Sequence, residues 1–238
     1  MALNTVAAQQ AGHLPRRTIS IGGVGNEPRF NLEISEAADD QSSGRAGIGT
    51  IVVRNQAGAK VQTLTCDLSE EPAIDRNDPR DFVLSAESID LDFDGLPDIR
   101  AVRAYTMKTQ LYCIWLFDPE GRGGFIQDAL SHQLTDLENL TVDSQRHLIL
   151  SRTIGPTEPQ VDEYRIDTHA AFGGHYYTNR RLLPVRSCML TDMTSLDTPW
   201  TAIVVSYVNG QEVVKRQKVS SECNDPCADG CAAWDAHR

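Results

Sequence analysis

Short runs of alternating apolar and polar residues follow one another along most of this chain, and they are rich in valine, isoleucine, threonine and tyrosine. A period of two places the apolar side chains on one face of an extended strand, and β-branched and aromatic residues favour that conformation. Turn-forming residues such as glycine, proline and asparagine separate the runs. The pattern predicts strands over residues 18–23, 30–35, 49–55, 60–68, 81–86, 98–106, 110–117, 147–154, 162–167, 175–190, 201–208 and 211–219.

The connections between the runs refine this prediction. Asn209-Gly210 lies between the last two runs, and this dipeptide is typical of the type I′ turn of a β-hairpin. A single stretch, residues 127–143, has apolar residues at helical intervals, which predicts one short helix with leucines facing the core. About a dozen short strands in a chain of this length favour an all-β fold. We predict a small, incomplete β-propeller-like arrangement of short antiparallel sheets.

The two ends of the chain differ in composition from its centre. Residues 1–16 are small and polar without a period and predict a flexible leader, whereas residues 17–220 form the predicted β domain. Residues 221–238 form a predicted cysteine-rich tail. The sequence has no apolar run of the roughly 18 residues that a membrane span requires, and its first residues lack an apolar signal region. If the protein is exported, we expect that its signal has been removed.

Charge narrows the classes of partner. The chain has 33 acidic residues against 22 basic ones, for a formal net charge of -11. Such a balance argues against binding to a nucleic-acid backbone and favours cationic partners or metal ions.

The 6 cysteines indicate the compartment. An even number is typical of disulfides in an oxidising environment, so we expect a periplasmic or secreted protein, with the pairing left open. An alternative is a zinc site formed by the last three cysteines and His237, but zinc motifs usually pair cysteines at short spacing in two separate knuckles. We therefore favour disulfides, with candidates Cys66, Cys113, Cys188, Cys223, Cys227 and Cys231.

The segment DLDFDGLPDI (90–99) places four aspartates around one glycine. Carboxylates this close repel one another unless a cation lies between them. Alternate side chains point inward, and the glycine at the sixth position permits the turn that brings the next carbonyl round, which is the ligand order of a calcium loop. The predicted ligands of a calcium ion (Ca2+) are Asp90, Asp92, Asp94, Leu96 through its carbonyl, and Asp98.

This loop differs from an EF-hand. The twelfth position, where an EF-hand has a bidentate glutamate, is Ala101, and the loop leads directly into a predicted strand. A calcium ion between β elements, with a structural role, is therefore predicted instead of a regulatory sensor. The alternative is a solvated acidic turn without metal.

Catalytic motifs are missing from the sequence. It contains no G-x-S-x-G or H-E-x-x-H motif, and its GGVGNE segment (22–27) leads to a proline and another predicted strand, where a dinucleotide fingerprint needs a helix. The neighbouring carboxylates of Asp162 and Glu163 are of a kind common in any acidic protein. We predict that the protein is not an enzyme.

The calcium loop and the segments after it resemble a known family. DLDFDGLPDIRAV, then YCIWLFDP, GGFIQ and LSHQL, resemble the calcium-binding periplasmic lysozyme-inhibitor proteins, the immunity partners of peptidoglycan-hydrolase effectors in antibacterial type IV secretion. The resemblance covers about residues 81–167. It implies an incomplete β-propeller with one calcium site and a non-enzymatic inhibitor that occludes the active site of a lysozyme-like hydrolase.

The inhibitory contacts do not carry over from the resemblance. The segment GPTEPQVDEY (155–164) is a candidate partner-binding loop because its prolines limit its flexibility, and its candidate contacts are Glu158, Glu163 and Tyr164. The alternative function is a calcium-dependent β-propeller adhesion module that binds glycan or protein without inhibiting an enzyme.

Overall fold

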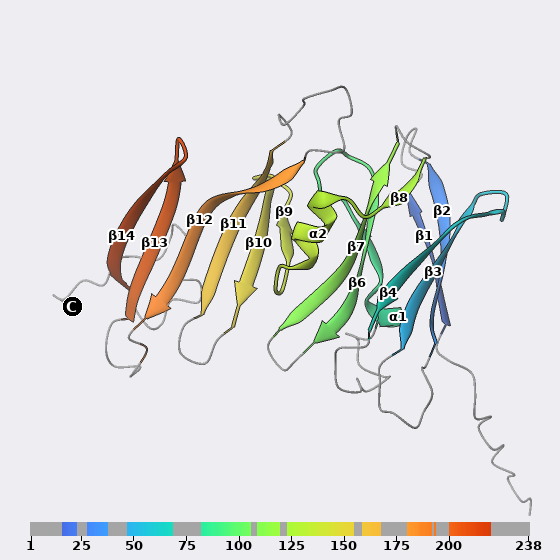
Figure 1. The fold of residues 1–238 in the computed structure, drawn as a ribbon, viewed down its shortest axis with the longest axis horizontal. Coiled ribbons are helices and arrows are strands. Elements are labelled where there is room, and N and C mark those ends of the chain that lie inside the picture. Colours follow the sequence, from blue (N-terminus) through green and yellow to red (C-terminus); the bar gives the residue numbers. More distant parts are fainter. Residues whose placement is uncertain are drawn as a thin grey trace, which may run out of the picture.

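The computed structural model describes ten segments of the chain, and all structural statements below concern these residues: 16–22, 28–37, 47–68, 82–105, 109–119, 123–154, 159–167, 180–191, 193 and 200–219. They form three antiparallel sheets that follow one another in chain order (Figure 1). Within each sheet, strands that are consecutive in the sequence are neighbours.

The first sheet contains four strands in the order of the chain: β1 (Arg16–Gly22), β2 (Arg29–Ala37), β3 (Ile48–Asn55) and β4 (Lys60–Asp67). Alternation decides which face is buried. Leu32 and Ile34 of β2 and Ile51 and Val53 of β3 are at most 1% exposed, whereas the residues between them are more accessible.

The middle sheet has the order β5 (Glu87–Ile89), β6 (Asp98–Tyr105), β7 (Gln110–Asp118) and β8 (Gly124–Ile126). Its strand β7 is an almost continuous apolar run because both of its faces are covered. Trp115 and Phe117 pack into a cluster shared with the first sheet, whereas Ile114 and Leu116 point to a second cluster. The middle sheet thus lies between two apolar cores: the first core, which it shares with the first sheet, and the second core, on its other face.

The third sheet contains six strands in the order β14-β13-β12-β11-β10-β9. Helix α2 packs against β7 and β12 and contributes Leu130 and Leu134 to the second core (Figure 1). The bounds are α2 (Ala129–Thr135), β9 (Thr141–Asp143), β10 (Leu148–Thr153), β11 (Gln160–Asp167), β12 (Arg181–Thr191), β13 (Trp200–Val208) and β14 (Gln211–Val219).

Two side-chain links connect the first sheet to the middle one. A disulfide joins Cys66 of β4 to Cys113 of β7. The amide of Gln62 on β4 donates to the carbonyl oxygen of Phe125 (2.6 Å) and accepts from its N–H (2.9 Å), so that one side chain pairs with the backbone of β8. These links hold the two sheets over their shared core.

The all-β prediction is confirmed, and so are most predicted strands. The Asn209-Gly210 turn joins β13 to β14 with φ values of 52° and 76°, the left-handed conformation that a type I′ turn requires. The predicted helix exists as α2, shorter than residues 127–143. The propeller-like arrangement stays a prediction, because the described residues form open sheets.

The strand predicted over residues 81–86 is wrong. Residues 82–85 form one helical turn, α1 (Phe82–Ser85), which buries both Phe82 and Val83 in the first core. Two adjacent buried residues suit a helical turn, whereas a strand would send them to opposite faces. Arg17 of β1 donates a hydrogen bond to the Leu84 carbonyl oxygen, a contact 67 residues away in sequence that local pattern does not reveal.

Other predictions fall partly on residues outside the described set. This holds for the leader to residue 15, for Cys223, Cys227 and Cys231 of the tail, and for residues 175–179 of the strand predicted at 175–190. Cys188 is disulfide-bonded. None of the helices formed by the described residues has the length and apolarity needed to cross a membrane.

Candidate metal centre

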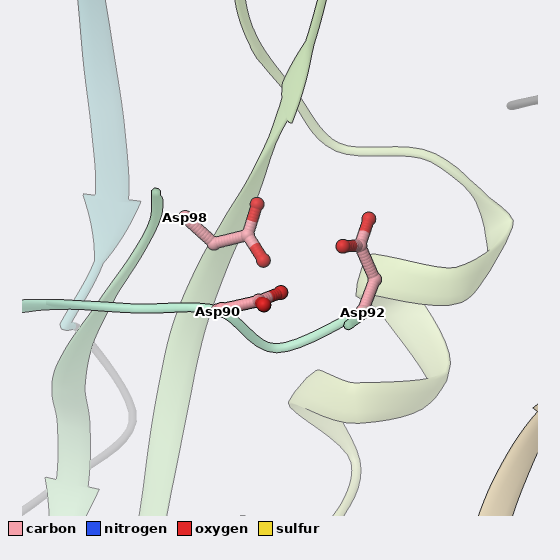
Figure 2. A group of neighbouring side chains, drawn as sticks. All are labelled: Asp90, Asp92 and Asp98. Atoms are coloured by element: carbon pink, nitrogen blue, oxygen red, sulfur yellow. The ribbon is translucent and has the colours of Figure 1, made fainter. Parts of the chain in front are cut away.

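Three aspartates converge where the loop between β5 and β6 meets the middle sheet. Asp90 follows β5, Asp92 lies in the loop, and Asp98 is the first residue of β6. Each offers a carboxylate oxygen, and these oxygens all lie within 4.8 Å of one another. Figure 2 shows the three carboxylates turned toward a common point.

The loop folds this way because its aspartates bind its own backbone. The amide of Asp94 donates to Asp92 Oδ1 (3.2 Å), and the amide of Gly95 donates to Asp90 Oδ2 (3.1 Å). Gly95 has a φ of 83°, which glycine adopts without the steric cost of a Cβ atom. Side chains fix the loop on both sides: Leu91 lies in the second core, and Leu96 packs against the first.

Asp98 connects the loop to the sheet. Its side chain is fully buried. Oδ2 accepts a hydrogen bond from the Leu91 amide and Oδ1 accepts one from the Phe117 amide of β7, both at 2.8 Å. Each oxygen keeps a lone pair that a cation can use.

A buried arginine faces the same cluster. The Arg180 guanidinium, 6% exposed, forms a salt bridge with Asp92, whose side chain has no exposure. Its other terminal nitrogen lies 3.5 Å from Asp128 Oδ2, at the N-cap of α2. Sequence reasoning missed Arg180 and Asp128 because neither stands in a motif, and Arg180 is 88 residues from Asp92.

The electrostatics of the cluster favour an added cation. Burial raises the pKa of Asp92 to about 6, although the Arg180 guanidinium acts in the opposite direction. Burial and repulsion from Asp92 raise the pKa of Asp98 well above its ordinary value. Burial also raises the pKa of Asp90, against a hydrogen bond from the Gly95 amide that lowers it. One arginine cannot balance three such carboxylates.

The donor set fits a hard divalent cation. Asp90 Oδ1 is buried and has no hydrogen-bond partner among the described residues, so an oxygen with free lone pairs faces the cluster. Carboxylate oxygens are the ligands that calcium prefers. Of the five predicted ligands, the structure brings together Asp90, Asp92 and Asp98. Asp94 lies outside this group: it is exposed and accepts from the Leu96 amide through Oδ1 (2.7 Å). The Leu96 carbonyl stays a predicted ligand.

The predicted partner-binding residues lie elsewhere. Glu158 is outside the described residues. Residues 160–164 belong to strand β11, which confirms the strand predicted over 162–167, whereas the overlapping loop prediction over 155–164 is wrong for residues 160–164. Glu163 is buried and ion-paired with Arg146 (3.3 Å) and Arg186 (3.9 Å). Tyr164 packs against the second core. Strand pairing explains the difference, because β10 and β12 pair with β11 on either side from residue 160 onward.

Comparisons with known proteins give one similarity of fold. No protein-family model and no curated protein matches the chain. Among solved structures, the fold is similar to that of a Xanthomonas type IV secretion system related protein, with a TM-score of 0.50 and 13% sequence identity. The similarity covers 88% of this chain and 97% of that chain. At this identity it concerns the fold alone.

Proposed function

We propose that this protein is a non-enzymatic, calcium-stabilised inhibitor that occludes the active site of a lysozyme-like peptidoglycan hydrolase in the periplasm. The observation that carries the proposal is the fold, which is similar over 88% of the chain to a type IV secretion system related protein. The resemblance of the DxDxDGxxD loop to calcium-binding immunity proteins of antibacterial type IV secretion supports it independently.

Calcium has a structural role in this proposal. Asp90, Asp92 and Asp98 would hold the ion, and the ion supplies positive charge that offsets their mutual repulsion. Because Asp98 also accepts hydrogen bonds from the loop and from β7, its ionised form ties the loop to the middle sheet. The residues that bind the metal thereby fix the loop between the two cores.

The burial of these carboxylates supports a function without catalysis. Counted over the whole residue, Asp92 and Asp98 are 5% and 0% exposed, so a polymeric sugar cannot reach their carboxylates. The neighbouring carboxylates of Asp162 and Glu163 already have partners. Gln160 donates to both oxygens of Asp162, and Glu163 is ion-paired with Arg146. A glycosidase needs two carboxyl groups that flank an accessible bond.

Net charge supports a cationic partner. At a net charge of -11, the chain attracts a basic protein over long range and raises the rate of encounter. A basic cell-wall hydrolase, which binds an anionic polymer, has the complementary charge.

The test is the lysis of peptidoglycan, followed by turbidity, with a panel of lysozyme-type hydrolases. We expect stoichiometric inhibition of at least one hydrolase by the calcium-loaded protein, and weaker inhibition by metal-depleted protein because the loop loses its support. Failure to inhibit any of the panel, together with a calcium-dependent rise in melting temperature, would contradict the inhibitor proposal and favour a calcium-dependent adhesion module.

A further inference from the structure

A cavity of about 390 Å³ lies beside the loop that carries the candidate metal ligands, residues 90–98. Three separate parts of the fold line it: the loop before β6, the turn between β9 and β10, and strand β11. The lining side chains are those of Asp92, Phe93, Arg146, His147, Arg165 and Ile166.

The cavity is cationic in a protein that is strongly acidic overall. Two guanidinium groups and one imidazole line it. Among the described residues that line it, Asp92 is the single acidic one, and its side chain is unexposed and already ion-paired with Arg180. The accessible charge of the cavity is therefore positive, which suits an anionic ligand.

Hydrogen-bond donors remain available in the cavity. Arg146 donates through Nη2 to Glu163 and lies 3.8 Å from Asp143, but its side chain is 53% exposed and has further N–H groups. Arg165 is exposed, and none of the described side chains forms an ion pair with it. A guanidinium presents parallel N–H donors that match the two oxygens of a carboxylate.

An aromatic pair forms another wall of the cavity. The rings of Phe93 and His147 stack with centroids 5.1 Å apart and an angle of 13° between their planes. Both residues have left-handed backbone, with φ values of 62° and 52°, a conformation that is uncommon for such side chains. The surrounding fold therefore imposes the position of the two rings. With Ile166, they offer apolar surface next to the guanidinium groups.

We propose that this cavity binds a carboxylate that carries a short apolar body, such as a short-chain carboxylic acid or the side chain of a glutamate. Arg165 and Arg146 bind the carboxylate oxygens, and the Phe93–His147 stack with Ile166 contacts the methylene groups. The proposal does not depend on inhibition of a hydrolase. Because Phe93 lies between two candidate calcium ligands, an ordered metal loop also orders one wall of the cavity.

The experiment is an NMR titration of calcium-loaded protein, at low and constant ionic strength, with three probes. Propionate represents free carboxylic acids, the peptide acetyl-Gly-Glu-Gly-amide represents an acidic side chain, and acetyl-Gly-Gln-Gly-amide is the neutral control. We expect saturable shifts of the Phe93 and His147 ring signals with propionate or with the Glu peptide, and none with the Gln peptide. Stronger binding of propionate would indicate that the natural ligand is a free carboxylic acid. Stronger binding of the Glu peptide would indicate that it is the side chain of a partner protein.

Two variants make the titration decisive. Arg165→Gln removes one charged donor and should weaken binding about tenfold, the loss expected for one charge-assisted hydrogen bond. Arg216→Gln, on the exposed edge strand β14, makes the same change in charge away from the cavity and should bind as the parent protein does. Equal affinities of the two variants, or shifts that map away from the two rings, would overturn the proposal. Signals of the β13–β14 hairpin report whether each variant is folded.

Discussion

Asp98 lies where the candidate metal loop (residues 90–98) meets the middle sheet, and both of its carboxylate oxygens accept backbone hydrogen bonds. Its position therefore combines two roles. The ionised carboxylate is a candidate ligand, and its geometry holds the Leu91 amide of the loop against the Phe117 amide of β7. Asp94, four residues earlier, has neither role in the structure, because it is exposed and lies outside the carboxylate group.

Substitutions at these two aspartates should have different effects. Asp98→Asn leaves one acceptor for two buried N–H donors, so we expect much weaker calcium binding and a loss of about 1–3 kcal/mol in the free energy of unfolding in calcium, where the parent carboxylate is ionised. Asp94→Asn keeps an acceptor for the Leu96 amide and should lower calcium affinity less. Urea unfolding and calcium titration of both variants check this. An equal loss of affinity in the two would place Asp94 among the ligands.

The raised pKa values of Asp92 and Asp98 predict how the stability of metal-free protein changes with pH. The pKa of Asp92 is about 6 in the folded state, against 3.8 for the free side chain. Between these values the folded protein binds more protons than the unfolded chain, so stability falls as pH rises through the window. Asp98, whose pKa is also raised, acts in the same direction.

Calcium should reverse this dependence on pH, because it binds the ionised carboxylates and competes with protons. We expect the apparent calcium affinity to fall as pH decreases below about 6. Melting temperatures measured from pH 4 to pH 8, with and without calcium, test both trends. A metal-free protein that gains stability as pH rises from 4 to 6 would contradict the electrostatic account.

At the scale of elements, β7 explains how two cores share one sheet. Its alternate residues belong to different apolar clusters, so the run LYCIWLF has no polar face. The first core also depends on close packing of small residues. A Cβ atom at Gly49 of β3 would lie 2.6 Å from the Phe82 ring of α1, so glycine permits the helical turn to approach the sheet.

The disulfide between Cys66 and Cys113 should contribute substantially to stability. It closes a segment with a sequence separation of 47 residues, for which the chain-entropy relation gives about 4 kcal/mol. The paired change Cys66→Ala with Cys113→Ala should therefore lower the free energy of unfolding by up to that amount, measured in urea. Calcium binding should persist, because neither cysteine belongs to the carboxylate group. Loss of less than about 1 kcal/mol would show that other contacts between β4 and β7 suffice.

At the scale of the molecule, the candidate metal loop contacts both the first and the second core. Leu91 contributes to the second core and Leu96 packs against the first, while Asp98 begins the central strand β6. The β13–β14 hairpin packs in a third cluster, with strand β12. Its edge strand β14 exposes Val213 and Val214, each 53% accessible.

Calcium should therefore slow amide hydrogen exchange more in some strands than in others. We expect calcium to slow amide hydrogen exchange most in β6 and β7 and least in β14, because local opening near the loop requires the loss of the metal contacts. Hydrogen exchange followed by NMR, in calcium-loaded and metal-depleted protein, measures the difference for each strand. A uniform change across the three sheets would indicate that calcium acts only on global unfolding.

The sequence by itself determined the features that depend on neighbouring residues. Alternation marked most of the strands, Asn209-Gly210 marked the hairpin, and the spacing of Asp90, Asp92 and Asp98 marked the loop whose carboxylates converge. Each of these patterns extends over only a few residues, because strand pleat, turn geometry and loop curvature are local properties of the backbone.

Only the tertiary structure decided the rest. Arg180 reaches Asp92 across 88 residues, and Arg17 reaches the helical turn of α1 across 67. The strand at Glu163 was predicted from the sequence, but its burial beside Arg146 and Arg186 was not, because those arginines come from other parts of the sheet. The cationic cavity likewise gathers residues from three parts of the chain. Such contacts follow from how the sheets pack, and no local periodicity encodes which distant side chain will face a buried charge.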